Sequence, residues 1–249
     1  MTAYDSGMST IDGSDDRLYF RQLLSGYSFA ADDQTARQMA NFVYLIGDRS
    51  TGECAVIDPA YSVQDIVDVA AADGMRITHA LATHYHPDHV GGSFMHMDIE
   101  GIAQLLEIQS VVVHANRHEV PWISRSTGVT DSHIVAHDGG DVLSIGGVDI
   151  TMVHTPGHTP GSQCFHVNGC LLSGDTLFLD GCGRTDLPGS DPAQMFESLQ
   201  TLDSMDSSTL VFPGHRYSPP AYESLEELRQ HNFVLKPKTK EQWLAVFAS

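Results

Sequence analysis

Four side chains of the kind that bind metals occur within six residues, directly after a short apolar strand, and this segment limits the possible folds more than any other. The strand is expected over residues 77–82, and the segment 83–89 reads Thr-His-Tyr-His-Pro-Asp-His. In extended backbone, residues two apart point to the same side, so His84 and His86 can offer two imidazoles to one ion. The chain then turns at Pro87, and Asp88 and His89 project toward a neighbouring point. One strand end therefore supplies ligands for two adjacent metal ions.

Three later segments share one pattern, in which an apolar strand ends in a glycine-containing turn that carries a ligand-type residue. They are Thr155-Pro156-Gly157-His158, Leu172-Ser173-Gly174-Asp175 and Phe212-Pro213-Gly214-His215. Loops at strand ends are where rigid scaffolds place catalytic groups. Each segment alone could equally be a turn with a solvent-exposed polar side chain. Together with the first segment, they indicate one metal centre built from four strand ends.

Histidine is frequent in this chain, with 14 residues, so an isolated His-x-His pair would be a weak signal. Nine of the histidines lie outside the spacing described above, and we assign them no functional role. They are His79, His96, His114, His118, His133, His137, His154, His166 and His231.

The remaining pattern indicates one mixed α/β (α+β) domain over residues 17–249. Short apolar runs at 42–46 and 54–57 predict a hairpin, and apolar spacing over 63–72 predicts a helix that stops at Gly74. Asn168-Gly169 favours a second hairpin, and Asp191-Pro192 resembles the start of a helix that runs to about Leu202. Short helices from about Tyr222 and from Thr239 end the chain. Residues 1–16 are small, polar and acidic, and we expect a disordered arm there.

Composition excludes several classes of function. The net charge of −19, with only 13 Lys and Arg residues, would repel a phosphate backbone, so nucleic acid is not expected as a partner. No apolar run reaches the roughly 18 residues that span a bilayer, and no signal-peptide pattern is present. We therefore expect a cytoplasmic protein, no membrane partner, free cysteines and a small-molecule substrate. A homodimer is left open.

The ligand residues, in their order and approximate spacing, resemble the pattern of the metallo-β-lactamase superfamily, and the resemblance runs from about Asn41 to Tyr217. It implies an αββα sandwich with the metals at one edge of two sheets. It also implies the ligand assignment. The first metal would be held by His84, His86 and His158, the second by Asp88, His89 and His215, and Asp175 would bridge them.

These ligand types suit two divalent ions, with zinc expected first and iron or manganese also suitable. A water held between two such ions can lose a proton near neutral pH, and the resulting bridging hydroxide can attack a carbonyl carbon that one ion polarises. Asp88 is a candidate catalytic residue because it can accept a proton during turnover. Asp58 could orient a ligand from behind, although a strand-end turn residue is an equal interpretation.

Two branches of the superfamily fit poorly. Dinuclear β-lactamases usually carry a cysteine at the position of Asp175 together with a secretion signal, and the nucleases add a large domain for polyanionic substrates. The segment 174–178 (Gly-Asp-Thr-Leu-Phe) and the following Gly-Cys-Gly turn resemble glyoxalase II, a thioester hydrolase acting on acylglutathione. That resemblance implies substrate contacts from Arg184 and Tyr217, with a thiol conjugate as substrate. The residues after Tyr217 are too few for that family's helical substrate-binding domain, so glutathione itself is uncertain.

Persulfide dioxygenase is the alternative, and the segment 181–186 resembles it as well. It implies a single non-haem Fe(II) held by His84, His158 and Asp175, with open positions for O₂ and the sulfur substrate. The complete set of second-metal ligands and the Leu177-Phe178 pair favour hydrolysis. A third reading, a zinc ion that only stabilises the fold, is the weakest because structural zinc sites are closed and usually rich in cysteine.

Overall fold

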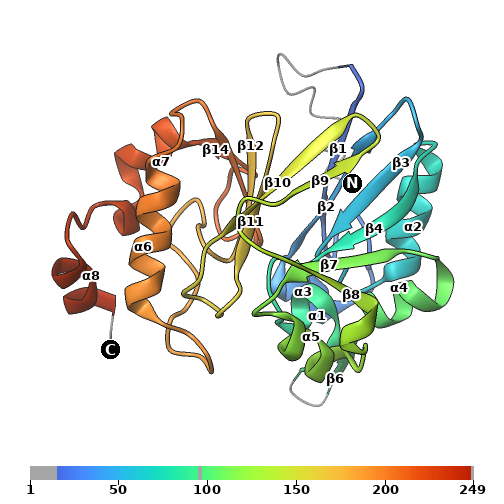
Figure 1. The fold of residues 1–249 in the computed structure, drawn as a ribbon, viewed down its shortest axis with the longest axis horizontal. Helices are drawn as coiled ribbons and strands as arrows, with labels where there is room; N and C mark the ends of the chain where they lie inside the picture. Colours follow the sequence, from blue (N-terminus) through green and yellow to red (C-terminus); the bar gives the residue numbers. More distant parts are fainter. Residues whose placement is uncertain (1–15, 95–96, 248–249) are drawn as a thin grey trace.

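The computed structural model describes residues 16–94 and 97–247, and two six-stranded sheets form its centre. The predicted arm over residues 1–16 therefore lies outside the described residues, apart from Asp16. Helices cover the outer face of each sheet, as the two flanking helical layers in Figure 1 show. This arrangement confirms the expected αββα sandwich.

The first sheet combines an antiparallel half and a parallel half. Its spatial order is β1 (Leu18–Leu24), β2 (Phe42–Asp48), β3 (Glu53–Ile57), β4 (Arg76–Leu81), β7 (Val112–Asn116) and β8 (Ile134–His137). β1, β2 and β3 pair antiparallel, and the pairs from β3 to β8 are parallel. Parallel neighbours need crossover connections. The helices in these connections are α2 (Val63–Ala72), α4 (Ile102–Ile108), α5 (Val120–Thr127) and the short η1 (Asp131–His133).

The second sheet is antiparallel except at one pair. Its order is β14 (Glu223–Ser224), β13 (Leu210–Pro213), β12 (Cys170–Gly174), β11 (Gln163–Val167), β10 (Val148–His154) and β9 (Val142–Ile145). β12 and β13 are parallel, and α6 (Pro192–Asp203) makes the crossover between them. α7 (Leu225–His231), η2 (Phe233–Leu235) and α8 (Lys240–Phe247) follow. The smaller elements are α1 (Gln34–Met39), α3 (Pro87–Val90), β5 (Gly92–Phe94) and β6 (Met97–Ile99).

Three apolar layers hold the sandwich together. The middle layer lies between the sheets, where the ring centroids of Phe20 on β1 and Phe212 on β13 are 4.9 Å apart. A second layer packs the first sheet against the helices beside it, with Ile66 of α2 and Ile102 of α4 fully buried. The third packs the other sheet against α6 and α8, where Trp243 is fully buried. Burial of these side chains is the main stabilising contribution to such a fold.

Several local predictions agree with the structure. α2 covers the predicted residues 63–72, and the hairpin at Asn168-Gly169 has both residues at positive φ, 45° and 75°. Asp191 caps α6 by accepting hydrogen bonds from the backbone of Ala193 and Gln194. The predicted helix at Tyr222 starts later, at Leu225, because Ser224 and Glu227 form the capping box there. Strand β1 and helices α1 and α5 were not predicted.

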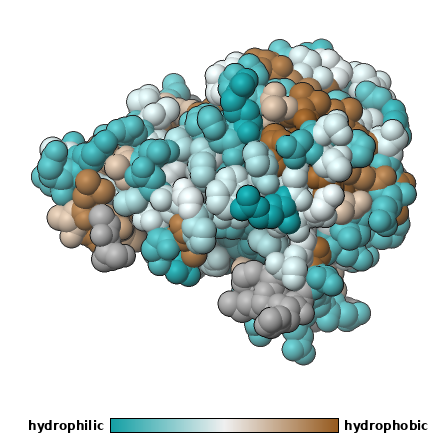
Figure 2. Space-filling model, turned by 60° about the horizontal axis from the view of Figure 1, so that its bottom comes forward, coloured by the Kyte–Doolittle hydropathy of each residue, from teal (hydrophilic) through white to brown (hydrophobic). Residues whose placement is uncertain are grey.

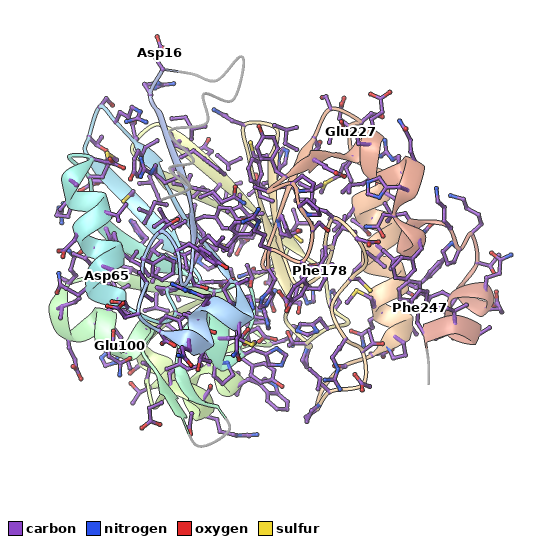
Figure 3. All side chains as sticks on the ribbon, turned by 180° about the vertical axis from the view of Figure 1, so that it is seen from behind. Asp16, Asp65, Glu100, Phe178, Glu227 and Phe247 are labelled. Atoms are coloured by element: carbon purple, nitrogen blue, oxygen red, sulfur yellow. The ribbon has the colours of Figure 1, made fainter. Side chains whose placement is uncertain are left out.

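The surface is mixed in character. Figure 2 shows hydrophilic residues spread over one face, with hydrophobic patches between them. Phe178 lies near the middle of the molecule, whereas Phe247 of α8 lies toward its outer, C-terminal side (Figure 3). Among the described residues, no helix combines the length and apolar character needed to cross a membrane.

Candidate metal centre

Four strands end at one edge of the sandwich, and the loops after them carry all seven residues that the sequence singled out. His84 and His86 follow β4, and α3 then contains Asp88 and His89. The other three residues follow β10, β12 and β13 and are His158, Asp175 and His215. Sequence neighbours and distant segments therefore meet at one place, as the pattern of strand ends predicted.

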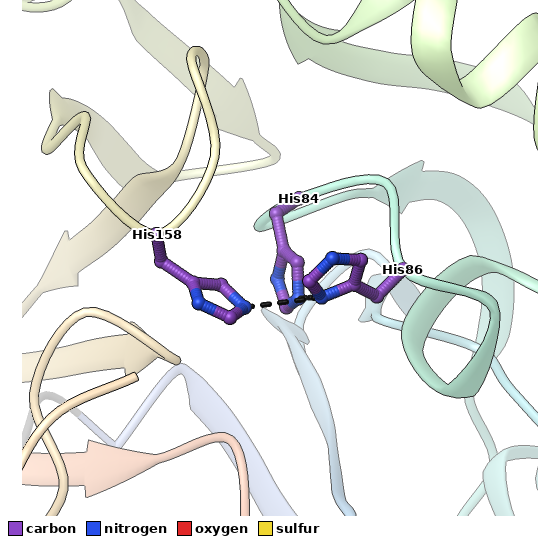
Figure 4. A group of neighbouring side chains, drawn as sticks. All are labelled: His84, His86 and His158. Atoms are coloured by element: carbon purple, nitrogen blue, oxygen red, sulfur yellow. Dashed lines mark hydrogen bonds between the residues drawn. The ribbon is translucent and has the colours of Figure 1, made fainter. Parts of the chain in front are cut away.

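His84, His86 and His158, the first ligand group, converge on one point. The Nδ1 atom of His86 lies 3.0 Å from Nε2 of His84 and 3.0 Å from Nε2 of His158. Figure 4 shows the three rings turned toward one another from two separate loops. His84 and His158 are buried, whereas His86 is partly exposed. The three ligand atoms are close enough to hold one metal ion.

Asp88, His89 and His215, the second ligand group, converge beside the first. The Nε2 atoms of His89 and His215 are 3.1 Å apart, and Asp88 Oδ2 lies 3.6 and 3.4 Å from them, respectively. All three residues are buried. Their ligand atoms also lie within reach of one ion.

Asp175 lies between the two groups. One oxygen, Oδ2, is 3.7 Å from Nε2 of His158 in the first group and 3.5 Å from Nε2 of His215 in the second. The other oxygen, Oδ1, is 3.4 Å from Nε2 of His89 and has no hydrogen-bond partner although it is buried. A buried carboxylate oxygen without a partner is costly unless a cation satisfies it.

The partners of the Nδ1 atoms, the ring nitrogens that face away from the site, show whether the ligand groups suit a cation. His89 Nδ1 faces Asp58 Oδ2 at 2.9 Å, and His215 Nδ1 faces the carbonyl oxygen of Met39 at 2.8 Å. Both partners are acceptors, so each neutral ring carries its hydrogen on Nδ1 and presents a lone pair at Nε2. Two lone pairs then face each other across 3.1 Å. No hydrogen bond between neutral rings can satisfy that contact, whereas a cation can, either a metal ion or the proton that Asp175 and Asp88 favour on His89.

The first ligand group gives the same result. His158 Nδ1 lies 2.8 Å from the carbonyl oxygen of Arg184, and His84 Nδ1 lies 3.0 Å from Thr83 Oγ1. The Thr83 hydroxyl donates to Asp58, so it accepts from His84. The Nε2 atoms of His84 and His158 therefore both present lone pairs to His86, which can donate to only one of them. The residues present fit metal ions at both groups.

Burial and charge affect the two groups differently. Burial lowers the pKa of His84 well below its ordinary value, and burial together with His158 lowers the pKa of His86 to about 4. In the second group, burial opposes protonation of His89, but Asp175 and Asp88 outweigh it and raise its pKa to about 10. The first group is therefore a set of neutral imidazoles, whereas the second attracts positive charge.

Several supporting residues behind the ligands had no clear signal in the sequence. Asn41 donates to Asp88 Oδ2 at 3.1 Å and accepts from the Tyr61 hydroxyl at 3.2 Å. Asp58 adopts a φ of +54°, and strained backbone of this kind clusters at functional sites. Only Asp58 was considered from the sequence, since it directly follows an apolar strand. Asn41 and Tyr61 belong to no motif there.

Glu119 is a further supporting residue that the sequence did not indicate. It is fully buried, and its Oε1 accepts hydrogen bonds from Thr159 Oγ1 and the backbone of Gly161, both at 2.7 Å. These bonds fix the loop that carries His158. Burial raises the pKa of Glu119 to about 7.

Glycines allow the ligand loops to pack this closely. A Cβ atom at Gly214 would lie 2.4 Å from Asp175 Oδ1, and one at Gly183 would lie 2.8 Å from His158 Nδ1. Gly174 has a φ of +50° directly before Asp175. Side chains at these positions would displace the ligands, which explains the glycine-containing turns seen in the sequence.

A cavity of about 750 Å³ opens in front of the ligands. Arg184 and Tyr217, the predicted substrate-binding residues, both line it. The guanidinium of Arg184 is bound by Asp186, with two contacts of 2.9 and 2.8 Å. Tyr217 stacks on the ring of His215, with centroids 4.7 Å apart. The basic residues Lys236, Lys238 and Lys240 do not line this cavity.

Three histidines outside the ligand groups, His79, His114 and His137, form a row across β4, β7 and β8. Nδ1 of His79 lies 2.9 Å from Nε2 of His114, and Nδ1 of His114 lies 2.9 Å from Nε2 of His137. Nδ1 of His137 lies 3.3 Å from Asp141 Oδ2, which accepts. Each ring can therefore donate through Nδ1 and accept through Nε2. This histidine row satisfies its own hydrogen bonds without an ion.

The fold and this site are those of a known family. Residues 36–215 match the model of the metallo-β-lactamase superfamily. The chain belongs to this superfamily and is an enzyme with the metallohydrolase fold.

Two sequence relatives and one solved structure show which members of the superfamily this chain is similar to. The chain is 34% identical to hydroxyacylglutathione hydrolase of Rhodospirillum rubrum over 203 residues, which cover 81% of this chain and 72% of that protein. It is 28% identical to the probable polyketide biosynthesis zinc-dependent hydrolase BaeB of Bacillus velezensis, with 85% and 89% covered. Among solved structures, ETHE1 from Myxococcus xanthus has a TM-score of 0.76 at 26% identity, with 93% and 90% covered.

Proposed function

We propose that this enzyme is a hydrolase of small thioesters or esters that uses two divalent metal ions, most simply zinc. Its ligands would be the first and second ligand groups together with the shared Asp175. The observation that carries this proposal is the complete second ligand group, in which Nε2 of His89 and Nε2 of His215 lie 3.1 Å apart beside the buried, unpartnered Oδ1 of Asp175. A mononuclear enzyme that used only His84, His158 and Asp175 would have no need of the second ligand group.

The residues of the chain would divide the chemistry as follows. When bound, two divalent ions would lower the pKa of a shared water and polarise the acyl carbonyl. Burial would raise the pKa of Asp88, but positive charge on His89 and His215 outweighs it and holds the pKa below its ordinary value, and bound divalent ions would act in the same direction. Asp88 is therefore ionised near neutral pH and can accept a proton from the attacking water. Asn41 keeps the Asp88 carboxylate in place through its hydrogen bond to Oδ2.

The relatives support the reaction class more than the substrate. Two of them are named hydrolases, one of an acylglutathione and one zinc-dependent. The chain covers more of the second protein (89%) than of the first (72%). Hydrolysis of a thiol conjugate is compatible with both, and neither name fixes the thiol.

A second candidate is an iron-dependent persulfide dioxygenase. The structural likeness to ETHE1 extends over 93% of this chain and supports this candidate. It would use one Fe(II) held by His84, His158 and Asp175, a facial set of two histidines and a carboxylate. The complete second ligand group is what sets this candidate below hydrolysis.

Metal analysis combined with two assays tests the proposal. The protein is purified without added metal, its ions are identified and counted, and it is then assayed for thioester cleavage and for O₂ consumption with a low-molecular-weight persulfide. We expect two divalent ions per chain and thioester cleavage. A single iron with persulfide-dependent O₂ consumption would establish the second candidate instead.

A further inference from the structure

The walls of the cavity in front of the ligands are mainly apolar. The side chains beyond the ligands include Met39, Tyr85, Phe178, Leu187, Pro188 and Tyr217. They come from the segments around α1, β4, β12 and β13 and from the loop before α6. A cavity of this size and character suits a small molecule that buries most of its surface against apolar walls.

Charge on these walls is sparse and nearly balanced. Apart from the ligands, Arg184 is the one basic side chain among the described residues that line the cavity, and Asp180 adds a negative charge. The guanidinium of Arg184 donates through Nε and Nη2 to the two carboxylate oxygens of Asp186. A peptide thiol such as glutathione carries two carboxylates, which need donors or cations when they leave water. Apart from the ligands, the described residues of these walls supply no second basic side chain for the other carboxylate.

The aromatic walls are held in place before any ligand arrives. Tyr85 stacks on Trp122, with ring centroids 4.9 Å apart, and its hydroxyl donates to the carbonyl oxygen of Pro188 at 3.0 Å. Phe178 meets the edge of Tyr217, with centroids 5.1 Å apart, while Tyr217 stacks on His215. A preformed wall costs little ordering entropy on binding.

We infer that the substrate is a thioester with uncharged, apolar groups on its acyl or thiol side, rather than a conjugate of an acidic peptide thiol. This inference rests on the proposed hydrolase function and specifies its substrate class. In the reaction, the water oxygen adds to the acyl carbon and the carbon–sulfur bond breaks. The thiolate leaves with the electron pair and takes up one proton of the water, while the other proton is released to solvent, giving a carboxylate and a free thiol.

Matched thioesters test the inference directly. The same acyl group is presented on N-acetylcysteamine, which is neutral, and on glutathione, and kcat/KM is measured for acyl chains of increasing length. We expect kcat/KM to be at least tenfold higher for the neutral thiol and KM to fall up to roughly fourfold per added methylene. A tenfold preference for the glutathione thioester, or no dependence on chain length, would overturn the inference while leaving the hydrolase function intact.

Binding of ligands that cannot be hydrolysed separates the inference of an apolar substrate site from the proposed hydrolase function. S-Hexyl-N-acetylcysteamine and S-hexylglutathione are thioethers that cannot be hydrolysed, and calorimetry gives their Kd values for the purified protein. We expect the neutral thioether to bind at least as tightly as the glutathione form, and tenfold tighter binding of S-hexylglutathione would contradict the inference. If the neutral thioether binds but no thioester is cleaved, the hydrolase function fails and the apolar site stands.

A charge introduced on the wall adds a control. Leu187→Asp places a carboxylate in the cavity, and Leu187→Ala removes the same apolar contact without charge. We expect the Kd of the neutral thioether to rise severalfold in the alanine variant and more than tenfold in the aspartate variant. Unchanged Kd values in both variants would show that this wall does not contact the ligand.

Discussion

Two clusters of histidines in this protein have similar distances between ring nitrogens but different arrangements of hydrogen-bond donors and acceptors. In the histidine row of His79, His114 and His137, neighbouring ring nitrogens lie 2.9 Å apart and alternate between donor and acceptor. In the two ligand groups, neighbouring nitrogens lie 3.0 to 3.1 Å apart, and the outer acceptors leave lone pairs of the neutral rings facing one another, so a cation is needed between them. Spacing alone does not distinguish a metal centre from a structural row. The partners of the outer nitrogens do.

The largest effect should follow from removing the shared carboxylate. Asp175→Ala deletes an oxygen near both ligand groups, so we expect metal content to fall and kcat/KM to drop by about 1000-fold, as for the loss of several kcal/mol of stabilisation. Elemental analysis and thioester kinetics measure the two effects. Asp68→Ala, an exposed position on α2, is the control. Full activity in the Asp175 variant would remove this residue from the site.

His89→Ala separates the dinuclear scheme from the mononuclear one. We expect the metal content to fall from two ions to one and thioester hydrolysis to fall at least 100-fold, because the second ligand group loses one of its two imidazoles. The variant is measured by elemental analysis and kinetics. A persulfide dioxygenase would keep its iron and its O₂ consumption in this variant.

Asp58→Ala tests the outer partner of His89. Loss of the 2.9 Å contact frees the ring to change its tautomer and orientation, and such outer partners typically contribute 10- to 100-fold to metal affinity. We expect zinc affinity at the second site to weaken by about that factor in a competition titration with a chelator. Unchanged affinity would mean that Asp58 supports only the turn after β3.

His114→Leu tests whether the histidine row is structural rather than metal-binding. The change leaves His79 and His137 without their shared partner, so we expect a loss of about 1–3 kcal/mol in the free energy of unfolding. Metal content should stay as in the unaltered protein. Denaturant titration and elemental analysis measure both, and loss of metal would show that the histidine row does more than hold the strands.

The pH dependence of that variant has a defined sign. Burial, with His79 and His137, lowers the pKa of His114 to about 3. Its unfolded value is about 6.5. The folded state therefore resists protonation, and the stability from a neutral His114 is complete above pH 6.5 and is lost as pH falls toward 3. The gap between the two proteins should narrow by roughly 2 kcal/mol between pH 7 and pH 5. A constant gap would contradict the pKa shift.

The sequence predicted the parts of the fold that local chemistry determines. α2, the Asn168-Gly169 hairpin and the cap at Asp191 all depend on neighbouring residues. Strand β1 was missed because its polar residues Arg21 and Gln22 interrupt the alternation, and tertiary pairing with β2 determines it. α5 was missed because its N-cap residue, Glu119, makes no side-chain cap, so no usual N-cap residue marks the start of the helix.

The candidate site also contains residues that the sequence could indicate and residues that only the tertiary structure brings there. Its seven ligand-type residues each stand beside a strand end, so spacing could indicate them. Asn41, Tyr61 and Glu119 reach the site through contacts across 20 residues or more, and nothing adjacent to them in the sequence points there. The pairing of Arg184 with Asp186, two residues away, was visible in the sequence but only the structure shows that it occupies the guanidinium.

The glycines packed against the ligands affect how such an enzyme can change over evolution. Side chains at Gly174, Gly183 or Gly214 would collide with a ligand or its loop, so these turns tolerate few substitutions. The side chains of Met39, Leu187 and Pro188 on the cavity wall carry no such constraint, since only the backbone carbonyl of Met39 contacts a ligand, His215, while the side chains border the substrate space. New substrate preferences can therefore arise by exchanging wall residues one at a time while the metal chemistry is inherited unchanged.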